Sequence, residues 1–189
     1  MRVTLIGAGA LGSHVVLLGR NLPVEWTVID FDRVERKNTL SQFHSRMGLG
    51  RNKAQALAQA MQGLFGLRLK TAPHRLGPDN ADALLGDAAV LVDCVDHAET
   101  RRLIQRAARA RGVPCLHGAL AADGAYARVM WGEAFAVDPG GEGEATCEDG
   151  RHLPFIAMVA ARMVAALQRC IEDGVQHSEH VHPGGLIEV

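Results

Sequence analysis

Short apolar runs alternate with longer amphipathic segments over the first two thirds of the chain. The apolar runs have the length of buried strands and lie at residues 2–6, 26–30, 67–72, 89–95 and 113–119. The segments between them carry apolar residues at helical spacing and lie at residues 11–20, 51–65, 79–86 and 98–111. Strands that alternate with helices in this way form parallel βαβ units. The pattern therefore predicts an α/β fold with a Rossmann-like, doubly wound and mostly parallel sheet.

The pattern changes after the fifth predicted strand. Residues 125–131 are predicted to form an antiparallel or edge strand, and residues 137–150 form a loop rich in Gly and Glu. A long apolar helix is predicted from about 153 to 172, and the tail beyond it has the composition of one short strand. No internal repeat or linker interrupts the sequence. We therefore expect a single domain over residues 1–189, with a C-terminal strand and helix region appended to the parallel sheet.

Composition and charge are those of an ordinary globular domain. The chain is 48% hydrophobic and 22% charged, and its formal net charge is −1, so no single-sign field favours nucleic acid or an anionic membrane as a partner. No run reaches the roughly 18 apolar residues that cross a bilayer, and glycines interrupt the apolar N-terminus. We therefore expect a cytoplasmic protein. The four cysteines contain no C-x-x-C pair, so no structural zinc is expected.

A glycine-rich motif lies between the first predicted strand and the first predicted helix. Gly7, Gly9 and Gly12 form G-x-G-x-x-G, with Leu11 before the last glycine. This spacing allows a tight turn, and the helix after it presents free N–H groups to a phosphate. Asp30 follows the second strand, where a carboxylate accepts hydrogen bonds from ribose hydroxyls. These residues predict a nucleotide site. The alternatives are a turn that only packs closely and an Asp30 that only caps a loop.

Up to this point a nicotinamide-dependent oxidoreductase fits the sequence equally well, and the residues that follow distinguish the two. They form D-x-D-x-V-x-x-x-N from Asp30 to Asn38, with Asp32 as the second carboxylate, and Gln42 and Lys53 come after them. This run resembles the ThiF/MoeB/E1 superfamily of adenylating enzymes, in which polar and cationic residues at these relative positions surround a triphosphate. A dehydrogenase has no need for such residues there.

The resemblance extends along nearly the whole chain. Residues 92–101 contain D-x-x-D-x-x-x-x-R with Asp96 as the second carboxylate, and Thr146 and Cys147 precede Pro154 and an apolar helix, as in the family's C-terminal part. The resemblance implies a Rossmann-like fold that binds ATP with Mg²⁺ and adenylates a carboxylate. It also implies a homodimer that acts on the C-terminus of a ubiquitin-like or sulfur-carrier protein, or on another carboxylate.

The resemblance further implies roles for single residues. Lys53 is expected to be the phosphate cation, Asp96 to hold Mg²⁺ between phosphates, and Asn38 and Gln42 to donate hydrogen bonds to the phosphates. Cys147 stands where related enzymes capture the activated carboxyl group or transfer sulfur. Structural alternatives are an exposed surface Lys53, an Asp96 that caps the following helix, amides that satisfy loop backbone, and a non-catalytic Cys147.

One position departs from the family pattern. Where the family has N-x-x-R-Q, this chain has Ser41 between Asn38 and Gln42, and a neutral hydroxyl cannot supply an arginine's charge to the terminal phosphates. Arg46 or Arg51 could replace that charge from nearby, or a partner could supply an arginine. The first hypothesis is thus an active adenylyltransferase. The second is a non-catalytic nucleotide-binding module of the same fold, and the third is an NAD-dependent oxidoreductase.

Overall fold

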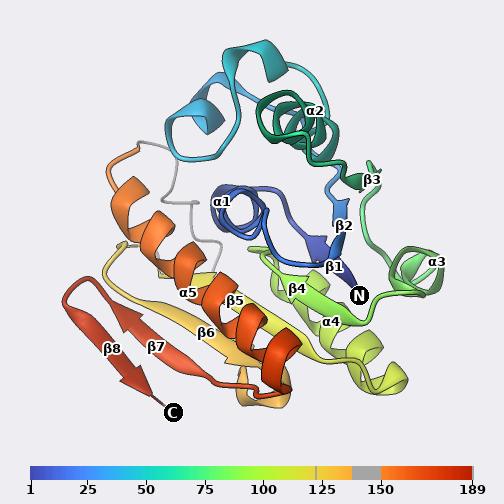
Figure 1. Cartoon of the computed structure of the whole chain (residues 1–189), viewed down its shortest axis with the longest axis vertical. Coiled ribbons are helices and arrows are strands. Elements are labelled where there is room, and N and C mark those ends of the chain that lie inside the picture. Colours follow the sequence, from blue (N-terminus) through green and yellow to red (C-terminus); the bar gives the residue numbers. More distant parts are fainter. Residues whose placement is uncertain (122, 138–149, 189) are drawn as a thin grey trace.

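The computed structural model describes residues 1–121, 123–137 and 150–188. At its centre is one eight-stranded sheet (Figure 1). In spatial order the strands are β3 (Lys70–Ala72), β2 (Glu25–Ile29), β1 (Arg2–Ile6), β4 (Val90–Asp93), β5 (Cys115–Leu120), β6 (Ala127–Trp131), β7 (Glu179–His182) and β8 (Gly185–Glu188). The strands from β3 to β5 pair in parallel, and β6, β7 and β8 continue the sheet in antiparallel pairs.

Helices cover both faces of this sheet. They are α1 (Ala10–Leu18), α2 (Lys53–Phe65), α3 (Ala81–Leu85), α4 (Ala98–Arg111) and α5 (Leu153–Asp173). One hydrophobic core joins the sheet to α1, α2 and α5, and α1 packs along α5 (Figure 1). A second core joins the sheet to α3 and α4. The central strands therefore lie between two layers of helices, which explains why β1 and β4 are almost entirely buried.

The predicted doubly wound α/β fold is confirmed. From β1 the chain winds outward through β2 to β3, then returns to the centre and winds the other way through β4 and β5. Several predicted elements are shorter in the structure: the strands predicted at 67–72 and 89–95 are β3 and β4, with three and four residues. The helix predicted at 79–86 is the five-residue α3, and the tail forms two strands rather than one. A turn at Pro183 and Gly184 folds β8 back on β7, because these two residues suit a tight reversal of the chain.

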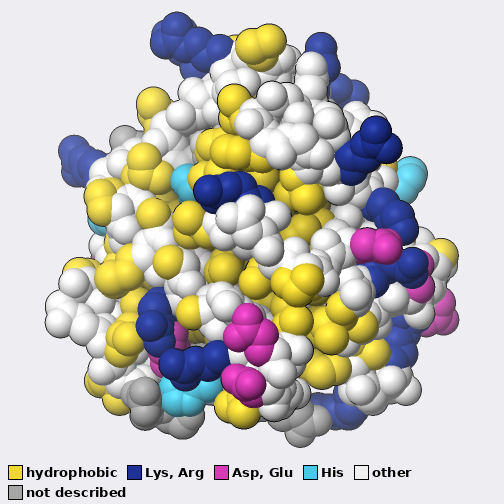
Figure 2. All heavy atoms as spheres, viewed as in Figure 1, with side chains coloured by type: hydrophobic (Ala, Val, Ile, Leu, Met, Phe, Trp, Pro, Cys, Tyr) yellow, Lys and Arg dark blue, Asp and Glu magenta, His cyan; other side chains and the backbone are white. Residues whose placement is uncertain are grey.

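α5 is long and apolar enough to cross a membrane by the criteria of length and composition alone. A core helix passes the same test, and in this structure the apolar stripe of α5 faces the sheet and α1. Ile156, Val159 and Met163 on this stripe are completely buried. Figure 2 shows hydrophobic side chains gathered around the middle of the face that carries α1 and α5. Burial against the sheet and α1 thus accounts for the apolar stripe of this helix.

Candidate active site

A cleft of about 810 Å³ opens where β1 and β4 lie side by side. The chain leaves β1 toward β2 and leaves β4 toward β5, so the two connections diverge. A doubly wound sheet binds its ligand in the crevice at this switch point, outside the carboxyl ends of the strands. The nucleotide-site residues predicted from the sequence that line the cleft are Gly7, Gly9, Leu11, Asp30, Asp32, Asn38, Gln42, Lys53 and Asp96.

Each glycine of the turn has its own structural reason. Gly7 has a φ of 93°, which favours glycine, and a Cβ there would lie 2.8 Å from the carbonyl oxygen of Cys94. A Cβ on Gly12 would lie 1.8 Å from the carbonyl oxygen of Gly7, so Gly12 lets α1 pack against the turn. A Cβ on Gly9 would meet no atom within 4 Å, and Gly9 lines the cleft. Gly7 and Gly12 therefore serve packing, whereas Gly9 leaves room for a ligand.

The N-terminus of α1 presents its backbone donors to the cleft. Gly9 is the N-cap and forms no side-chain cap hydrogen bond, and the first turn of the helix contains no acidic residue. The first N–H groups of a helix have no partner within the helix and carry the positive end of its dipole. The start of α1 is therefore an anion site at the base of the cleft.

Asp30 braces the glycine turn from the end of β2. Its Oδ2 accepts a hydrogen bond from the backbone N–H of Ala8 at 2.6 Å, and its Oδ1 accepts one from Asp32 at 2.8 Å. Burial raises the pKa of this carboxyl, although the two N–H donors and Lys53 act in the opposite direction. The structural role considered for Asp30 is thus present. Each carboxylate oxygen keeps a second acceptor position, so the brace leaves the ribose role available.

Lys53 begins α2 and lies inside the cleft. Its side chain is 11% exposed, and its Nζ lies 3.0 Å from Oδ2 of Asp32. The preceding residue, Asn52, is the N-cap of α2 and accepts a hydrogen bond from the backbone of Gln55. Its Nδ2 donates to the carbonyl oxygens of Asp30 at 2.7 Å and Asp32 at 3.1 Å. These bonds fix the start of α2 against the turn after β2, so Lys53 is not an exposed surface lysine.

The connection between β2 and α2 folds over the glycine turn and contains two short helices, η1 (Arg36–Leu40) and η2 (Arg46–Gly48). The side chain of Asn38 accepts a hydrogen bond from the backbone N–H of Glu35 at 2.8 Å. The amide oxygen of Asn38 therefore satisfies loop backbone. Gln42 lines the cleft, and its buried Oε1 has no hydrogen-bond partner among the described residues. The amide of Gln42 is available to a ligand.

Ser41 is buried behind the cleft rather than facing it. It is 1% exposed, it is absent from the cleft lining, and its Oγ has no partner among the residues that the structure describes. His14 of α1 donates from Nε2 to the carbonyl oxygen of Ser41 at 3.1 Å. His44 donates from Nε2 to the carbonyl oxygen of Ala8 at 2.9 Å. The two histidines thus tie this connection to α1 and to the glycine turn.

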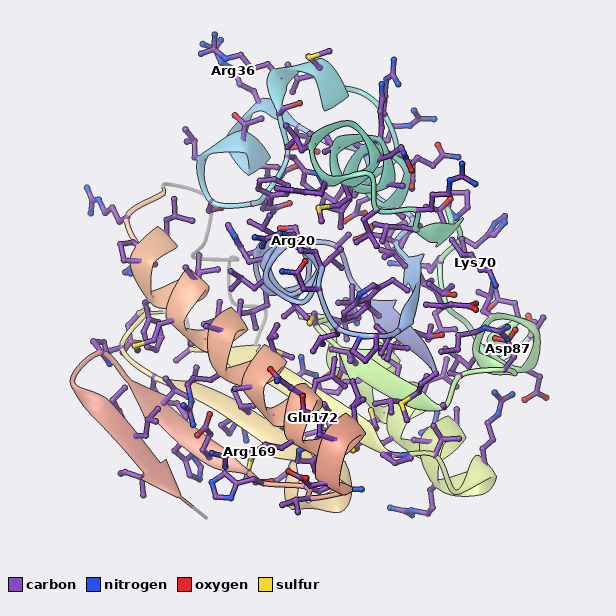
Figure 3. All side chains as sticks on the ribbon, in the orientation of Figure 1. Arg20, Arg36, Lys70, Asp87, Arg169 and Glu172 are labelled. Carbon is purple, nitrogen blue, oxygen red and sulfur yellow. The ribbon has the colours of Figure 1, made fainter. Side chains whose placement is uncertain are left out.

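The cations of the cleft differ from those considered as replacements for the missing arginine. Arg46 and Arg51 are exposed, and neither lines the cleft. Arg51 instead donates to the side chain of Gln59, and Arg36 points away from the molecule (Figure 3). Within the described ranges, the cations in the lining are Arg33, Lys37, Lys53, Arg75, Arg101 and Arg128. Arg75 and Arg128 lie outside the recognised motifs, so only the fold reveals that they share this cleft.

Asp96 lines the cleft from the turn after β4. It is exposed, and its carboxylate forms no hydrogen bond or ion pair with the described residues. α4 begins after His97, its N-cap, which forms no side-chain cap hydrogen bond. The structure therefore does not show the capping role considered for Asp96. A carboxylate without a protein partner in a cleft that contains an anion site is available to a cation.

A buried charged cluster next to the cleft was not predicted from the sequence. Asp93 ends β4 and His117 lies on β5, and both are fully buried, while Arg101 of α4 is nearly so. Oδ2 of Asp93 accepts from Nδ1 of His117 at 2.7 Å and lies 3.2 Å from Nε of Arg101. Asp93 and Arg101 belong to the D-x-x-D-x-x-x-x-R segment. Nothing in the sequence links His117 to them, because only strand pairing brings Asp93 opposite His117.

A second arm of the cleft extends along β5 and β6. It is lined by residues 118–121 and by Tyr126, Arg128 and Phe135. The guanidinium carbon of Arg128 lies 4.4 Å from the centre of the Phe135 ring, and the hydroxyl of Tyr126 hydrogen bonds to Nδ1 of His180. We refer to this region as the acceptor arm. No sequence motif marks it, because its residues come together only through antiparallel pairing of the strands.

The cysteines that the structure describes are poor candidates for nucleophiles. Cys115 lies in the core and Cys94 is partly buried in the wall of the cleft, and burial raises the pKa of both thiols, which disfavours the reactive thiolate. Cys147 lies outside the described residues, so its predicted role stays a prediction. Among the residues that are described, no group of three or more His, Cys, Asp or Glu side chains is placed to hold a metal ion.

Comparison with known sequences identifies relatives for this arrangement. A model of the ThiF family matches residues 1–180. The SAMP-activating enzyme E1 of Haloferax volcanii is 32% identical over 122 residues, which are 63% of this chain and 45% of that protein. The probable adenylyltransferase/sulfurtransferase MoeZ of Mycobacterium tuberculosis is 32% identical over 136 residues, or 70% of this chain and 35% of the relative. The chain thus matches less than half the length of either relative.

Comparison with solved structures agrees on the fold. A crystal structure of E. coli MccB with ATP superposes on the whole of this chain with a TM-score of 0.77, over 62% of its own length. The sequence identity is 15%, so this similarity concerns the arrangement of strands and helices and not the chemistry of the site.

Proposed function

The chain belongs to the ThiF family, and from this premise we propose that it is an ATP-dependent adenylyltransferase that activates a carboxylate. The acceptor we propose is the C-terminus of a ubiquitin-like or sulfur-carrier protein. The names of the two relatives, a SAMP-activating enzyme and an adenylyltransferase/sulfurtransferase, support this choice. The observation that carries the proposal is Asp96, a carboxylate without a partner among the described residues that shares its cleft with Lys53 and the start of α1.

The glycine turn leaves room for the phosphates of a nucleoside triphosphate. The open space beside Gly9 allows a phosphate to approach the backbone, and the free N–H groups of α1 supply donors to it. Lys53 adds a full positive charge, and Gln42, which lines the cleft, would donate to a phosphate from its amide N–H group. We assign the phosphates to this side of the cleft and the ribose to Asp30.

Asp96 fits a Mg²⁺ site in which phosphate oxygens supply further ligands. Mg²⁺ commonly uses one or two carboxylates together with phosphate oxygens and waters, and a single free carboxylate in the cleft matches that requirement. When bound, Mg²⁺ would offset negative charge on the phosphate oxygens. The contribution of the protein is a carboxylate that forms no ion pair with a cation in the part of the chain that the structure describes.

In the proposed reaction a carboxylate oxygen attacks the α-phosphorus of ATP and pyrophosphate leaves. Negative charge increases on the phosphate oxygens during this step, so the groups that stabilise it must already be in place. The N–H groups of α1 are fixed by the glycine turn, and Asp32 holds the Nζ of Lys53 at 3.0 Å in the cleft. The acceptor carboxylate approaches along the acceptor arm, where Tyr126 and Arg128 line the wall.

A second function is a nucleotide-binding module that does not turn over, and the burial of Ser41 favours it. Because Ser41 does not face the cleft, the missing arginine is not replaced at the same place. The described cations Lys37 and Arg128, which line the cleft, are the sources of charge that the first function requires. Measured turnover decides between the two functions.

We further propose that the protein is a cytoplasmic homodimer that binds neither nucleic acid nor membrane. The formal net charge of −1 supports the second part, because it provides no field for a polyanion. The role of Cys147 as acceptor of the activated acyl group is also a proposal. Sedimentation of the purified chain tests the dimer, and a Cys147→Ser variant that blocks transfer but leaves adenylation intact would support the thiol.

Ligand binding provides the first test. We expect ATP with Mg²⁺ to raise the melting temperature more than NAD does at equal concentration, since Lys53 and Asp96 suit a metal triphosphate. A larger shift with NAD would overturn the proposal and support an oxidoreductase.

Pyrophosphate exchange provides the second test and uses candidate carrier proteins as well as the chain alone. We expect exchange that requires Mg²⁺ and that falls roughly 100-fold or more in Asp96→Asn at an unchanged melting temperature. Asp173→Asn, an exposed change at the end of α5, is the matched control and should exchange normally. Full exchange in Asp96→Asn would remove Asp96 from the mechanism. Binding of ATP without any exchange would favour the non-catalytic module.

A further inference from the structure

The buried cluster of Asp93, Arg101 and His117 borders the cleft, and Arg101 is part of its lining. Asp93 is the only acid in the cluster: Nδ1 of His117 donates to its Oδ2, and Nε of Arg101 forms an ion pair with the same oxygen at 3.2 Å. Taking charged groups out of water costs free energy, and well-packed apolar side chains usually serve stability equally well. Stability alone therefore does not explain the cluster, whereas the segments that it holds in place do.

The cluster holds the peptide of Val95 from both sides. Oδ1 of Asp93 accepts the N–H of Val95 at 3.0 Å, and Nη2 of Arg101 donates to the carbonyl oxygen of Val95. Val95 is followed directly by Asp96, which has no hydrogen bond of its own to the described residues. The position of the Asp96 backbone is therefore set by the two bonds to Val95.

Arg101 also reaches the acceptor arm. Its Nη2 donates to the carbonyl oxygen of Gly118 at 3.1 Å, and its guanidinium carbon lies 4.6 Å from the centre of the Phe135 ring. Gly118 and Phe135 both line the acceptor arm. One guanidinium thus contacts both the turn that carries Asp96 and two residues of the acceptor arm.

We propose that Arg101 is a positioning residue that fixes Asp96 for its cation and holds the acceptor arm in register with it. This inference rests on the proposed function, in which Asp96 holds Mg²⁺ with ATP. Asp93 orients the guanidinium, and His117 fixes Asp93 in turn. Groups that orient a metal ligand commonly change metal affinity about 10- to 100-fold when they are replaced.

The proposed positioning role requires the several hydrogen-bond donors of a guanidinium group. Arginine presents several donors in one plane, whereas the lysine ammonium is a single point with flexible reach. A lysine at position 101 can keep the charge pair with Asp93 but cannot also bond the carbonyl oxygens of Val95 and Gly118 in the same geometry. Arg101→Lys should therefore keep the fold and lose the positioning.

The test compares Arg101→Lys and Arg101→Gln with the wild type by calorimetric titration of ATP, with and without Mg²⁺. We expect the metal-free affinity to stay within about twofold, while the Mg²⁺ concentration at half-saturation rises about 10- to 100-fold. Amide hydrogen exchange gives a readout that is independent of activity. The Val95 amide should be protected in the wild type and should exchange at least tenfold faster in both variants.

Arg102→Gln is the matched control, because Arg102 is the next residue of α4 and is exposed. It should leave both titrations and the Val95 amide unchanged. If Arg101→Gln does not fold, Arg101→Lys decides alone. Unchanged Mg²⁺ dependence in Arg101→Lys overturns the positioning role, as does an equal loss of ATP affinity with and without Mg²⁺. A wild type whose ATP binding is independent of Mg²⁺ overturns the proposed function together with this inference.

Discussion

At the scale of single residues, the glycines of the turn have different structural roles. The open side of Gly9 belongs to the cleft, whereas Gly12 is pressed against the backbone of Gly7. Both positions are glycine in the motif, yet the physical reasons are opposite: one requires empty space for a ligand and the other requires the absence of a side chain within the fold.

Alanine at these two glycines should separate binding from stability. Gly9→Ala should keep the melting temperature and weaken ATP binding roughly tenfold or more, because the added methyl group enters the space of the phosphates. Gly12→Ala should lower the free energy of unfolding by about 3 kcal/mol or more, since its Cβ would overlap the carbonyl oxygen of Gly7. Urea unfolding and calorimetry measure the two effects. Equal stability of both variants would contradict this division.

Ser41 leads to a second prediction at this scale. An arginine there would place its charge in a buried position that is not part of the cleft lining. Ser41→Arg should therefore lower the free energy of unfolding by roughly 3–5 kcal/mol without raising pyrophosphate exchange. Ser41→Ala is the control and should be nearly neutral, because the Oγ has no partner among the described residues. A stable and more active Ser41→Arg would show that the connection rearranges to expose this position.

At the scale of elements, α5 connects the parallel part of the sheet to its antiparallel extension. Its apolar stripe packs on α1, β5 and β6. Farther along the sheet, Arg162 donates from Nε and Nη2 to the two carboxylate oxygens of Glu179 on β7, at 2.7 and 2.6 Å. Glu179 is almost fully buried, so this pair is the polar link between the helix and the C-terminal strands.

Removal of one partner of that link should be more harmful than removal of both. Arg162→Met leaves the carboxylate of Glu179 buried without its guanidinium and should cost roughly 3 kcal/mol in the free energy of unfolding. The double variant Arg162→Met with Glu179→Leu should recover most of this loss, because no buried charge is then left unpaired. Urea unfolding measures both. A single variant as stable as the double would show that the link contributes little.

At the scale of the whole molecule, the connection between β2 and α2 lies on the surface but is anchored to the core through a few buried residues. His14 and His44 make its long-range hydrogen bonds to α1 and to the glycine turn. Burial lowers the pKa of both histidines, and for His44 the nearby charges of Lys53 and His14 lower it further. The folded protein therefore favours the neutral form of both side chains.

The stability of the protein should consequently fall in mild acid. The folded-state pKa of each histidine lies below the unfolded value of about 6.5. As the pH falls through that value, the unfolded chain therefore binds more protons than the folded protein does. The free energy of unfolding should then decrease between pH 7.5 and pH 5.5, a window chosen on the order of one unit either side of 6.5. Urea unfolding of wild type and of His14→Gln with His44→Gln measures this.

The double variant should show a shallower dependence on pH, and His74→Gln, an exposed histidine, should show that of the wild type. An identical slope in the wild type and the double variant would mean that other groups cause the acid sensitivity.

The sequence by itself determined the local parts of this protein. Alternation of apolar runs and helical spacing predicts the order β1, α1, β2, α2 and onward, because burial of each strand and of one face of each helix is a property of the segment itself. The motif residues Gly7, Gly9, Asp30 and Lys53 were also predicted, since the spacing of the motif fixes their place on a strand end, a turn or a helix start. All four line the cleft.

Only the tertiary structure decided which distant residues meet. The pairing of β4 with β5 places His117 on Asp93, and the pairing of β5 with β6 brings Arg128 to the acceptor arm. The buried position of Ser41 depends in the same way on how the connection folds over α1. Register and packing arise from contacts between segments far apart in the chain. The pattern within one segment does not indicate which other segments will pack against it.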